Sequence, residues 1–175
     1  MDVLPGSIDP QLLNLATMLA EPPADEVEEP WQQSNQYALV EVAGHSFAID
    51  IGMARQIIER PQITPVPNTP DFILGVCNVR GDIFSIVDIR PLLGFDLPPP
   101  DVDPDPVIIV LEGAQYACGA TIQAVSELLR ISESQIVEPT TEIPFVAGIF
   151  RRGQDTILIL DVQGLLDSPE MTQFR

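Results

Sequence analysis

The sequence predicts an all-β fold, made of two small five-stranded β-barrels with short helical turns and preceded by a mostly flexible N-terminal extension. Three observations predict it. Short apolar runs alternate with turn residues from position 36 onward, the second half of the chain repeats a pattern of the first, and tracts of proline and acids interrupt the apolar pattern. Short strands with closely spaced turn signals are typical of barrels or sandwiches rather than of parallel α/β sheets.

The N-terminal extension, residues 1–35, contains seven acids and no base. Asp9 and Pro10 form a helix-start signal, and apolar residues at helical spacing after them predict a short amphipathic helix. Residues 21–35 are acidic and proline-rich, which predicts a flexible, self-repelling linker.

The β-like part of the chain contains several hairpin signals. The clearest is Arg80-Gly81-Asp82 between two apolar runs, because glycine supplies the positive φ of a tight turn. Thr69 and Pro70 predict a helical turn that ends at Gly75, and Ser132 with Gln135 predicts a capping box. The expected strands are 37–42, 46–51, 54–59, 76–79, 83–88, 107–111, 116–121, 124–129, 149–150 and 156–160.

The two halves of the chain resemble each other. When Phe72 is aligned with Phe145, further positions match without a gap: Gly75 with Gly148, Asp88 with Asp161, and Leu92-Leu93 with Leu165-Leu166. This repeat predicts a duplicated β unit. We expect a first barrel mainly in 36–97, a connector in 98–106, a second barrel mainly in 107–166, a C-terminal tail in 167–175, and a groove between the two barrels.

The composition excludes several partners and chemistries. The net charge of −18 makes nucleic acid and anionic membrane surfaces unsuitable partners. The sequence lacks an apolar run of about 18 residues, so we expect no direct membrane insertion. The chain has no lysine, so Schiff-base chemistry and a P-loop are excluded. Cys77 and Cys118 lie in apolar runs without a CxxC motif, which predicts buried, reduced thiols in the cytoplasm.

Three patterns imitate active sites, and each has a simpler interpretation. Gly44 to Ala48 approaches a nucleophile elbow, but it lies between two strands, and His45 is next to the serine. The acids of 101–112 match an EF-hand loop, but a proline stands where glycine is needed. Asp88 and Asp161 resemble paired carboxylates, yet each precedes an apolar turn that it would cap.

A zinc site and a phosphorelay are also poorly supported. The chain has one histidine, His45, on a turn, and Cys77 and Cys118 are its only other soft metal ligands. We therefore expect no catalytic, cofactor-binding or metal-binding residues, and no enzyme activity.

The segment 63–90, ITPVPNTPDFILGVCNVRGDIFSIVDIR, resembles the signature of CheW domains, and the likeness extends over 36–170. The resemblance implies a CheW-like fold of two five-stranded barrels. It also implies a non-enzymatic scaffold that couples chemoreceptor cytoplasmic tips to the regulatory domain of a CheA-type histidine kinase. Other CheW-like domains of the array would be further partners, and the chain would be cytoplasmic, joined to membrane receptor arrays through them.

The same resemblance implies a partner-binding surface. Arg80 matches the arginine of the family's N-x-R-G stretch, which governs receptor docking and kinase control. The family usually has a larger aliphatic residue at Ala54 and an acid at Gln56, so partner choice is expected to differ. The expected partner-binding residues are Ile51, Ala54, Gln56, Ile57, Asn78, Arg80, Gly81, Arg151 and Arg152.

Two alternatives remain open at this point. One is a CheW-like adaptor of a type IV pilus motility or phototaxis system. The other, of a different class, is a sensor that binds a small ligand inside one β-barrel.

Overall fold

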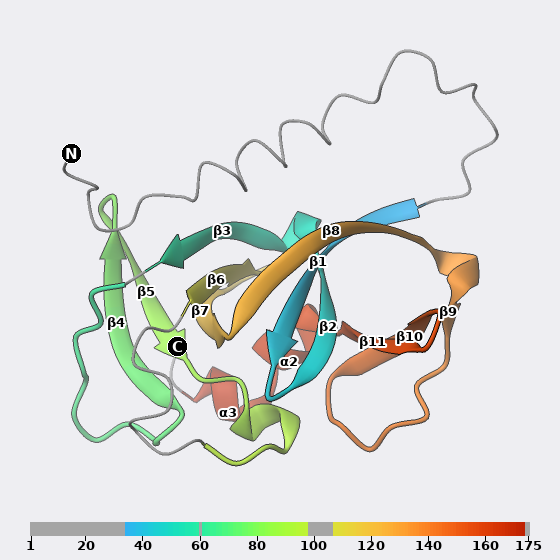
Figure 1. The fold of residues 1–175 in the computed structure, drawn as a ribbon. Helices are drawn as coiled ribbons and strands as arrows, with labels where there is room; N and C mark the ends of the chain where they lie inside the picture. Colours follow the sequence, from blue (N-terminus) through green and yellow to red (C-terminus); the bar gives the residue numbers. More distant parts are fainter. Residues whose placement is uncertain (1–33, 60, 98–106, 174–175) are drawn as a thin grey trace.

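The computed structural model describes residues 34–59, 61–97 and 107–173, coloured along the chain in Figure 1. The expected N-terminal helix, most of the acidic linker and the expected connector 98–106 lie outside the described residues.

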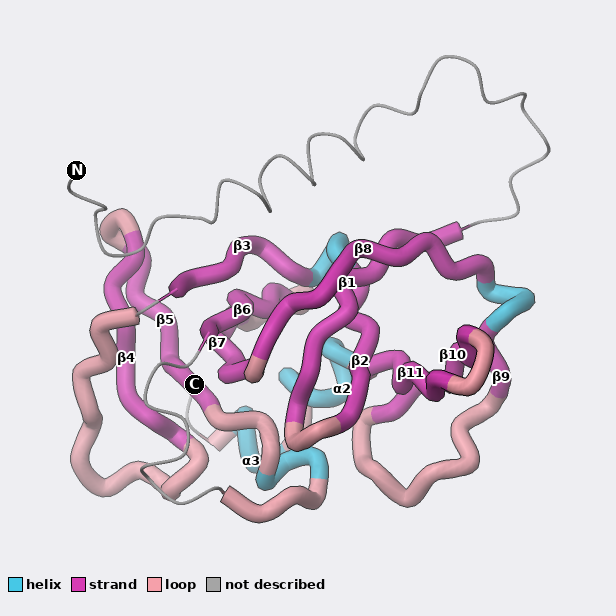
Figure 2. Tube along the Cα trace, viewed as in Figure 1, coloured by secondary structure: helices cyan, strands magenta, loops and turns pink. Residues whose placement is uncertain are grey.

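Strands dominate the described chain, and helices are confined to short segments (Figure 2), so the expectation of an all-β fold is confirmed. The strands are β1 (Ser34–Val42), β2 (His45–Asp50), β3 (Ala54–Glu59), β4 (Ile73–Val79), β5 (Asp82–Val87), β6 (Val107–Glu112), β7 (Ala117–Ile122), β8 (Ala124–Ser132), β9 (Ile136–Val137), β10 (Val146–Arg152) and β11 (Asp155–Leu160). The helical segments are the 3-10 turns η1 (Ile51–Met53), η2 (Pro91–Leu93) and η3 (Glu133–Gln135) and the helices α2 (Val162–Leu166) and α3 (Pro169–Thr172).

The strands form two curved sheets that lie side by side (Figure 1). The six-stranded sheet has the order β8-β1-β2-β11-β10-β9, and the five-stranded sheet has the order β3-β6-β7-β5-β4. Most neighbours are antiparallel, but β11 runs parallel to β2, and β5 runs parallel to β7. Each sheet therefore combines an antiparallel hairpin (β1–β2 or β6–β7) with strands from elsewhere in the chain.

The division of the chain between the sheets differs from the expected 36–97 and 107–166. The first repeat supplies β1 and β2 to the six-stranded sheet but β3, β4 and β5 to the five-stranded sheet. The second repeat supplies β6 and β7 to the five-stranded sheet and β8 to β11 to the six-stranded sheet. The two repeats thus exchange strands, an arrangement that local sequence patterns do not specify because it depends on pairing between distant segments.

Both sheets curl in the same way. In the six-stranded sheet, one edge strand, β8, is followed within one 3-10 turn by β9 at the opposite edge, and Val137 of β9 pairs with Ile149. In the five-stranded sheet, Thr64, which follows β3, makes a bridge to Val76 on the edge strand β4. Each sheet is therefore closed toward a small barrel by the segment that follows its first edge strand.

Alternating side chains of each strand enter different hydrophobic clusters. On β6, Ile108 and Val110 point into the interior of the five-stranded sheet, whereas Ile109 and Leu111 face the space between the sheets. β11 follows the same rule, with Ile159 inside the six-stranded sheet. These strands are buried on both faces, which explains their nearly continuous apolar sequences.

The groove expected between the barrels is not found among the described residues, because side chains of both sheets fill this space. The strand faces that meet there form the largest hydrophobic cluster among the described residues, and Leu93 of η2, Leu165 of α2 and Met171 of α3 complete it from one side. Burial of each such side chain contributes roughly 1.5–3 kcal/mol, so this space is a shared core that holds the two sheets together.

The helical turn expected from Thr69 and Pro70 is shorter than predicted: the Pro70 carbonyl oxygen accepts a hydrogen bond from the Ile73 nitrogen at 2.9 Å, but β4 begins at Ile73 and Gly75 lies inside it. Gly75 has a φ of 142°, and a Cβ atom there would be 2.2 Å from the carbonyl oxygen of Thr64. The glycine is needed for the close approach of Thr64 to β4, not for the end of a helix.

Candidate functional site: the tip of the β4–β5 hairpin

The β4–β5 hairpin turns through two residues with left-handed backbone conformations. Val79 pairs with Asp82 across the turn, and Arg80 and Gly81 between them have φ angles of 54° and 91°. Two consecutive positive φ values are typical of a type I′ turn, whose twist matches that of the flanking strands. The left-handed conformation costs a non-glycine residue about 1–2 kcal/mol, so strand pairing on both sides must hold Arg80 in place.

Asn78 stabilises this turn directly. Its Oδ1 accepts a hydrogen bond of 3.0 Å from the backbone nitrogen of Gly81. The side chain that we expected to contact a partner is therefore engaged with its own hairpin. Its role in the structure is to position Arg80 and Gly81.

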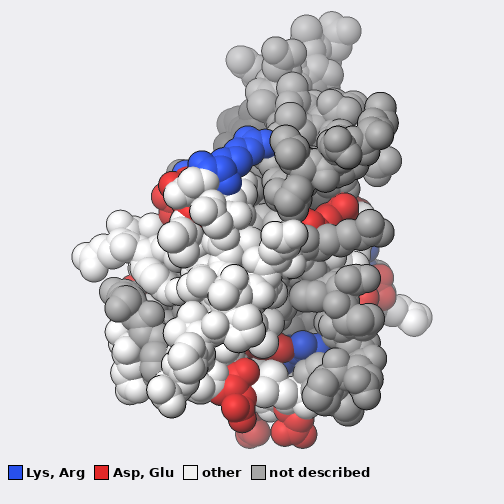
Figure 3. Space-filling model, turned by 90° about the vertical axis from the view of Figure 1, so that its left-hand side faces the viewer, with Lys and Arg blue, Asp and Glu red and all other residues white. Residues whose placement is uncertain are grey.

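A positively charged side chain and an exposed apolar side chain lie close together at this hairpin. Ile83, directly across the hairpin from Asn78, is 69% exposed, the largest exposed fraction among the large hydrophobic residues that the structure describes. Arg80 is exposed and has no ion pair with a described residue. We call the exposed residues Asn78, Arg80, Gly81 and Ile83 the tip surface. Figure 3 faces the side of the molecule that carries β4 and β5, and most of the described surface there is uncharged.

Arg55 on β3 contacts the hairpin next to its turn. Its guanidinium lies 3.5 Å from an Asp82 carboxylate oxygen and 3.7 Å from a Glu112 oxygen, and it lies over the Phe84 ring, 5.8 Å from the centroid. All three charged side chains are substantially exposed, so each ion pair contributes well under about 1 kcal/mol. Together the contacts orient the hairpin relative to β3.

The expected contact residues near β3 divide by burial. Ile51 and Ala54 are half-buried and pack against the core between the sheets, and Gln56 is also half-buried. Ile57 is only 9% exposed and belongs to that core. Its side chain is engaged in intramolecular packing and offers little surface to a partner, and its expected contact stays a prediction.

The pair Arg151 and Arg152 lies on β10, in the other sheet, and is not part of the tip surface. Arg152 donates to a Glu127 carboxylate oxygen at 2.7 Å, which ties β10 to β8. Arg151 is exposed and has no ion pair with a residue that the structure describes. The structure therefore separates the expected residues into two surfaces, one on each sheet.

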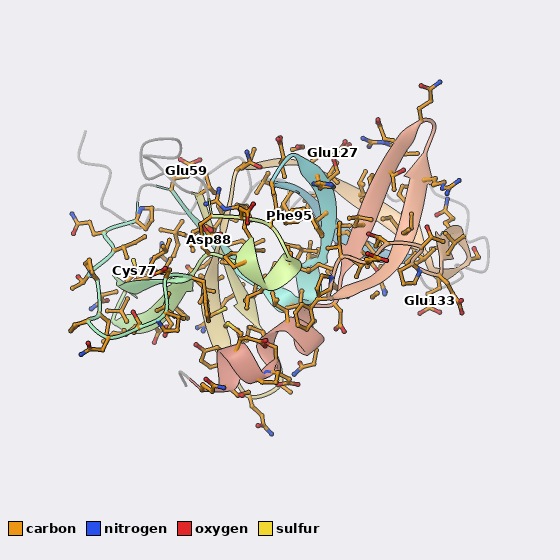
Figure 4. The ribbon with its side chains drawn as sticks, turned by 90° about the horizontal axis from the view of Figure 1, so that it is seen from below. Glu59, Cys77, Asp88, Phe95, Glu127 and Glu133 are labelled. Atoms are coloured by element: carbon orange, nitrogen blue, oxygen red, sulfur yellow. The ribbon has the colours of Figure 1, made fainter. Side chains whose placement is uncertain are left out.

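The two repeat-related aspartates cap turns, as expected. Asp88 is 2% exposed, lies between the sheets (Figure 4), and accepts hydrogen bonds from the Arg90 backbone nitrogen at 3.0 Å and from its Nε at 2.8 Å. Asp161 accepts from the Gly164 nitrogen at 2.9 Å at the start of α2. Both carboxylates thus have structural partners.

The residues that imitated reactive groups also have structural roles. The His45 Nδ1 atom lies 3.0 Å from the Ala43 carbonyl oxygen, and its ring stacks on Phe95 with centroids 4.9 Å apart. Burial raises the pKa of the Cys118 thiol to about 12 and also raises the pKa of Cys77, so both are protonated thiols at neutral pH. Within the described ranges, no three metal-ligating side chains cluster.

Sequence reasoning missed two residues of this region, Arg55 and Ile83. The signal for Ile83 was present, since alternation along β5 places it on the face opposite to the buried Phe84 and Ile86. The contacts of Arg55 depend on how β3 and the hairpin meet, which no local pattern reveals.

Comparisons with known proteins match this architecture. The model of the CheW-like domain family matches residues 36–170. The CheW chemotaxis protein of Klebsiella aerogenes is 31% identical over 142 residues, which cover 78% of this chain and 84% of that protein. CheW of Helicobacter pylori is 27% identical and covers 89% and 96% of the two chains. The crystal structure of the scaffolding protein TtCheW from Thermoanaerobacter tengcongensis aligns with a TM-score of 0.69 at 27% identity, covering 79% of this chain and 96% of that one.

The fold and the tip surface together define a class of protein: a duplicated two-barrel β module that presents exposed hairpins on a shared core. Within that class, the chain belongs to the CheW-like family. None of the helices among the described residues has the length and apolarity needed to cross a membrane.

Proposed function

We propose that this chain is a non-enzymatic scaffold that couples methyl-accepting chemoreceptors to a CheA-type histidine kinase in a chemosensory array. Membership of the CheW-like family supports the proposal, since the similar proteins are named chemotaxis proteins and one is described as a scaffolding protein. The packing of both sheet interiors favours a scaffold over a small-ligand sensor, because apolar side chains of the protein fill each barrel.

The observation that carries the proposal is the exposure of Arg80 beside Ile83 on a turn fixed by Asn78. A helical receptor tip with apolar and acidic side chains would place its apolar residues on Ile83 and an acid against Arg80. A preorganised turn reduces the entropy lost on binding, which favours a specific contact from a small area.

The six-stranded sheet offers the second contact. Its β10 carries the exposed Arg151, far along the chain from the tip surface and on a different barrel. We assign this barrel to the kinase regulatory domain, which has the same fold, or to other CheW-like domains. Contacts of modest area on both barrels would gain strength from multivalency in an array.

The cytoplasm is the proposed location, with the chain held at membrane receptor arrays by its partners. Cys77 and Cys118 are free and buried, which fits a reducing compartment.

The test compares Arg80→Ala with Arg130→Ala. Arg130 is exposed on β8 and, like Arg80, lacks an ion pair with any described residue, so it is a matched control. In an array reconstituted with receptor and kinase, we expect Arg80→Ala to weaken receptor binding by about tenfold or more, the usual effect of an interface arginine that carries binding energy. Arg130→Ala should leave binding unchanged.

Ile83→Ser sharpens the test because it removes the exposed apolar surface without creating a cavity. Circular dichroism and denaturant unfolding would establish that every variant folds as the parent does. Kinase activation that survives both Arg80→Ala and Ile83→Ser would contradict the proposed receptor surface.

A further inference from the structure

A hollow on the six-stranded sheet includes Arg151, the residue assigned above to the second contact, but the proposed function does not account for its apolar walls. It encloses about 430 Å³, within the range of pockets that accept ring systems. Its walls come from η3, β9 and β10: Gln135, Val137, Ile149, Phe150 and Arg151. Three of the five wall residues are apolar, and Val137 is 51% exposed.

The one charged residue in this wall is Arg151, which has no ion pair with a described residue. Its neighbour Arg152 shows the contrast, since Glu127 neutralises it at 2.7 Å. An unpaired cation beside exposed apolar surface, in a chain with a net charge of −18, fits an occupant that combines an acid with an aromatic or aliphatic group.

The N-terminal extension joins the described fold beside this hollow. Ser34, the first residue of β1, pairs with Ser132 at the end of β8 (Figure 1). The Ser132 backbone nitrogen donates to Oε1 of Gln135 at 3.0 Å, and Gln135 is part of the hollow's wall. The extension therefore meets the described fold at Ser34, and the 3-10 turn η3 alone separates its pairing partner Ser132 from the wall of the hollow.

The last residues of the extension have the chemistry that the hollow requires. Trp31, the only tryptophan of the chain, lies three residues before Ser34, and Glu28 and Glu29 precede it. Three extended residues span at most about 10 Å, which is enough to reach across one helical turn and a strand. Residues 1–35 contain seven acids and no base, so the segment is complementary in charge to Arg151.

We propose that the N-terminal extension folds back onto this hollow, with Trp31 in its apolar part and Glu28 or Glu29 paired with Arg151. The short tether gives the segment an effective concentration in the millimolar range, so a weak contact is sufficient. The docked segment covers Val137 and Phe150. The inference does not depend on the identity of the partners proposed above.

The experiment uses the fluorescence of Trp31 in the full-length chain, where it is the only indole. We expect a blue-shifted emission and several-fold weaker quenching by acrylamide than for a peptide of residues 21–35. Arg151→Glu and Val137→Glu should each restore the peptide-like emission and quenching. Arg130→Glu, a charge reversal on β8 outside the hollow, should not.

A charge exchange separates docking from a general charge effect. Adding Glu28→Arg and Glu29→Arg to Arg151→Glu should restore the blue-shifted emission. Peptide-like Trp31 fluorescence in the parent chain, or a blue shift insensitive to Arg151→Glu and Val137→Glu, would overturn the proposal. A shift that disappears on dilution would also overturn it, because the hollow would then be filled by a second copy.

Discussion

The two barrels share one backbone plan but differ in the side chains that secure it. Asp88 and Asp161 are repeat-related, and their nitrogens donate to the carbonyl oxygens of Phe72 and Phe145 at 2.7 and 2.8 Å. Asp88, however, is buried in a bidentate pair with Arg90, whereas Asp161 is exposed and accepts a hydrogen bond from the turn of α2.

The barrels also close with ion pairs of opposite polarity. In the five-stranded sheet the cation, Arg55, is on the edge strand and its partner Asp82 is on the hairpin. In the six-stranded sheet the acid, Glu127, is on the edge strand and the cation, Arg152, is on the hairpin. The comparison shows that the two barrels keep the same backbone plan while their hairpins carry different charges.

The largest expected effect distinguishes the two repeat-related glycines. Gly75→Ala should destabilise the protein by about 3 kcal/mol or more, because a positive φ and a backbone clash combine there. Gly148→Ala places its Cβ atom 2.3 Å from the Ile136 Cγ2 atom, a side chain that can shift, and should cost about 1–2 kcal/mol. Denaturant unfolding measures both, and equal losses would show that the two glycine positions are equivalent after all.

The next largest difference in stability is expected between variants of the two repeat-related aspartates. Asp88→Ala removes the carboxylate that makes a bidentate pair with the mostly buried Arg90 guanidinium and should cost about 3 kcal/mol. Asp161→Ala removes a helix cap and should cost about 1 kcal/mol. Both free energies of unfolding come from urea titrations at neutral pH, and a loss below 1 kcal/mol for Asp88→Ala would refute the role given to the buried pair.

The two thiols lie in different environments. Cys77 is in the interior of a barrel, and Cys118 is in the core between the sheets. The folded-state pKa of Cys118 is raised to about 12 from 9.0, so above pH 9 the unfolded state loses a proton that the folded state keeps. Stability attributable to Cys118 is complete below pH 9 and falls as pH rises toward 12, by at most about 1.4 kcal/mol per pH unit.

The measurement is the pH dependence of unfolding for the parent chain, Cys118→Ala and Cys77→Ala between pH 8 and about 10.5. Cys118→Ala should flatten the decline more than Cys77→Ala does. Parallel curves for the parent chain and Cys118→Ala would show that the Cys118 thiol does not contribute to the decline.

The smallest effects concern the ion pairs that close the barrels. A double-mutant cycle on Glu127 and Arg152 should give about 0.5 kcal/mol, because the 2.7 Å contact is solvent-exposed. The cycle on Arg55 and Asp82, 3.5 Å apart, should give less. Couplings above about 1.5 kcal/mol would mean that closure of the barrels depends on these charges more than surface pairs allow.

Local features of the fold were predictable because local chemistry specifies them. The turn at Arg80 and Gly81, the capping box of Ser132 and Gln135, and the capping role of Asp161 all follow from short-range hydrogen bonding and backbone preference. The repeat also indicated two similar sheets.

Long-range features were not predictable. Exchange of strands between the repeats depends on pairings such as Leu39 with Glu127, which no local pattern encodes. Ile57 and Ile58 are adjacent apolar residues on β3 that enter different cores, so alternation did not reveal that Ile57 is buried. The tip surface was predicted in part, through Asn78, Arg80 and Gly81, while Ile83 was missed although the alternation along β5 indicated its exposure.

The strand exchange makes each half of the chain the complement of the other. Residues 34–97 alone would present two hairpins, β1–β2 and β4–β5, and the strand β3, which pairs with neither hairpin, and each piece would lack the neighbours that 107–166 provide. A half-length forerunner carrying a single repeat would satisfy its strands only by reciprocal pairing with an identical chain. The present chain carries both complements, so its two parts must fold in one cooperative step.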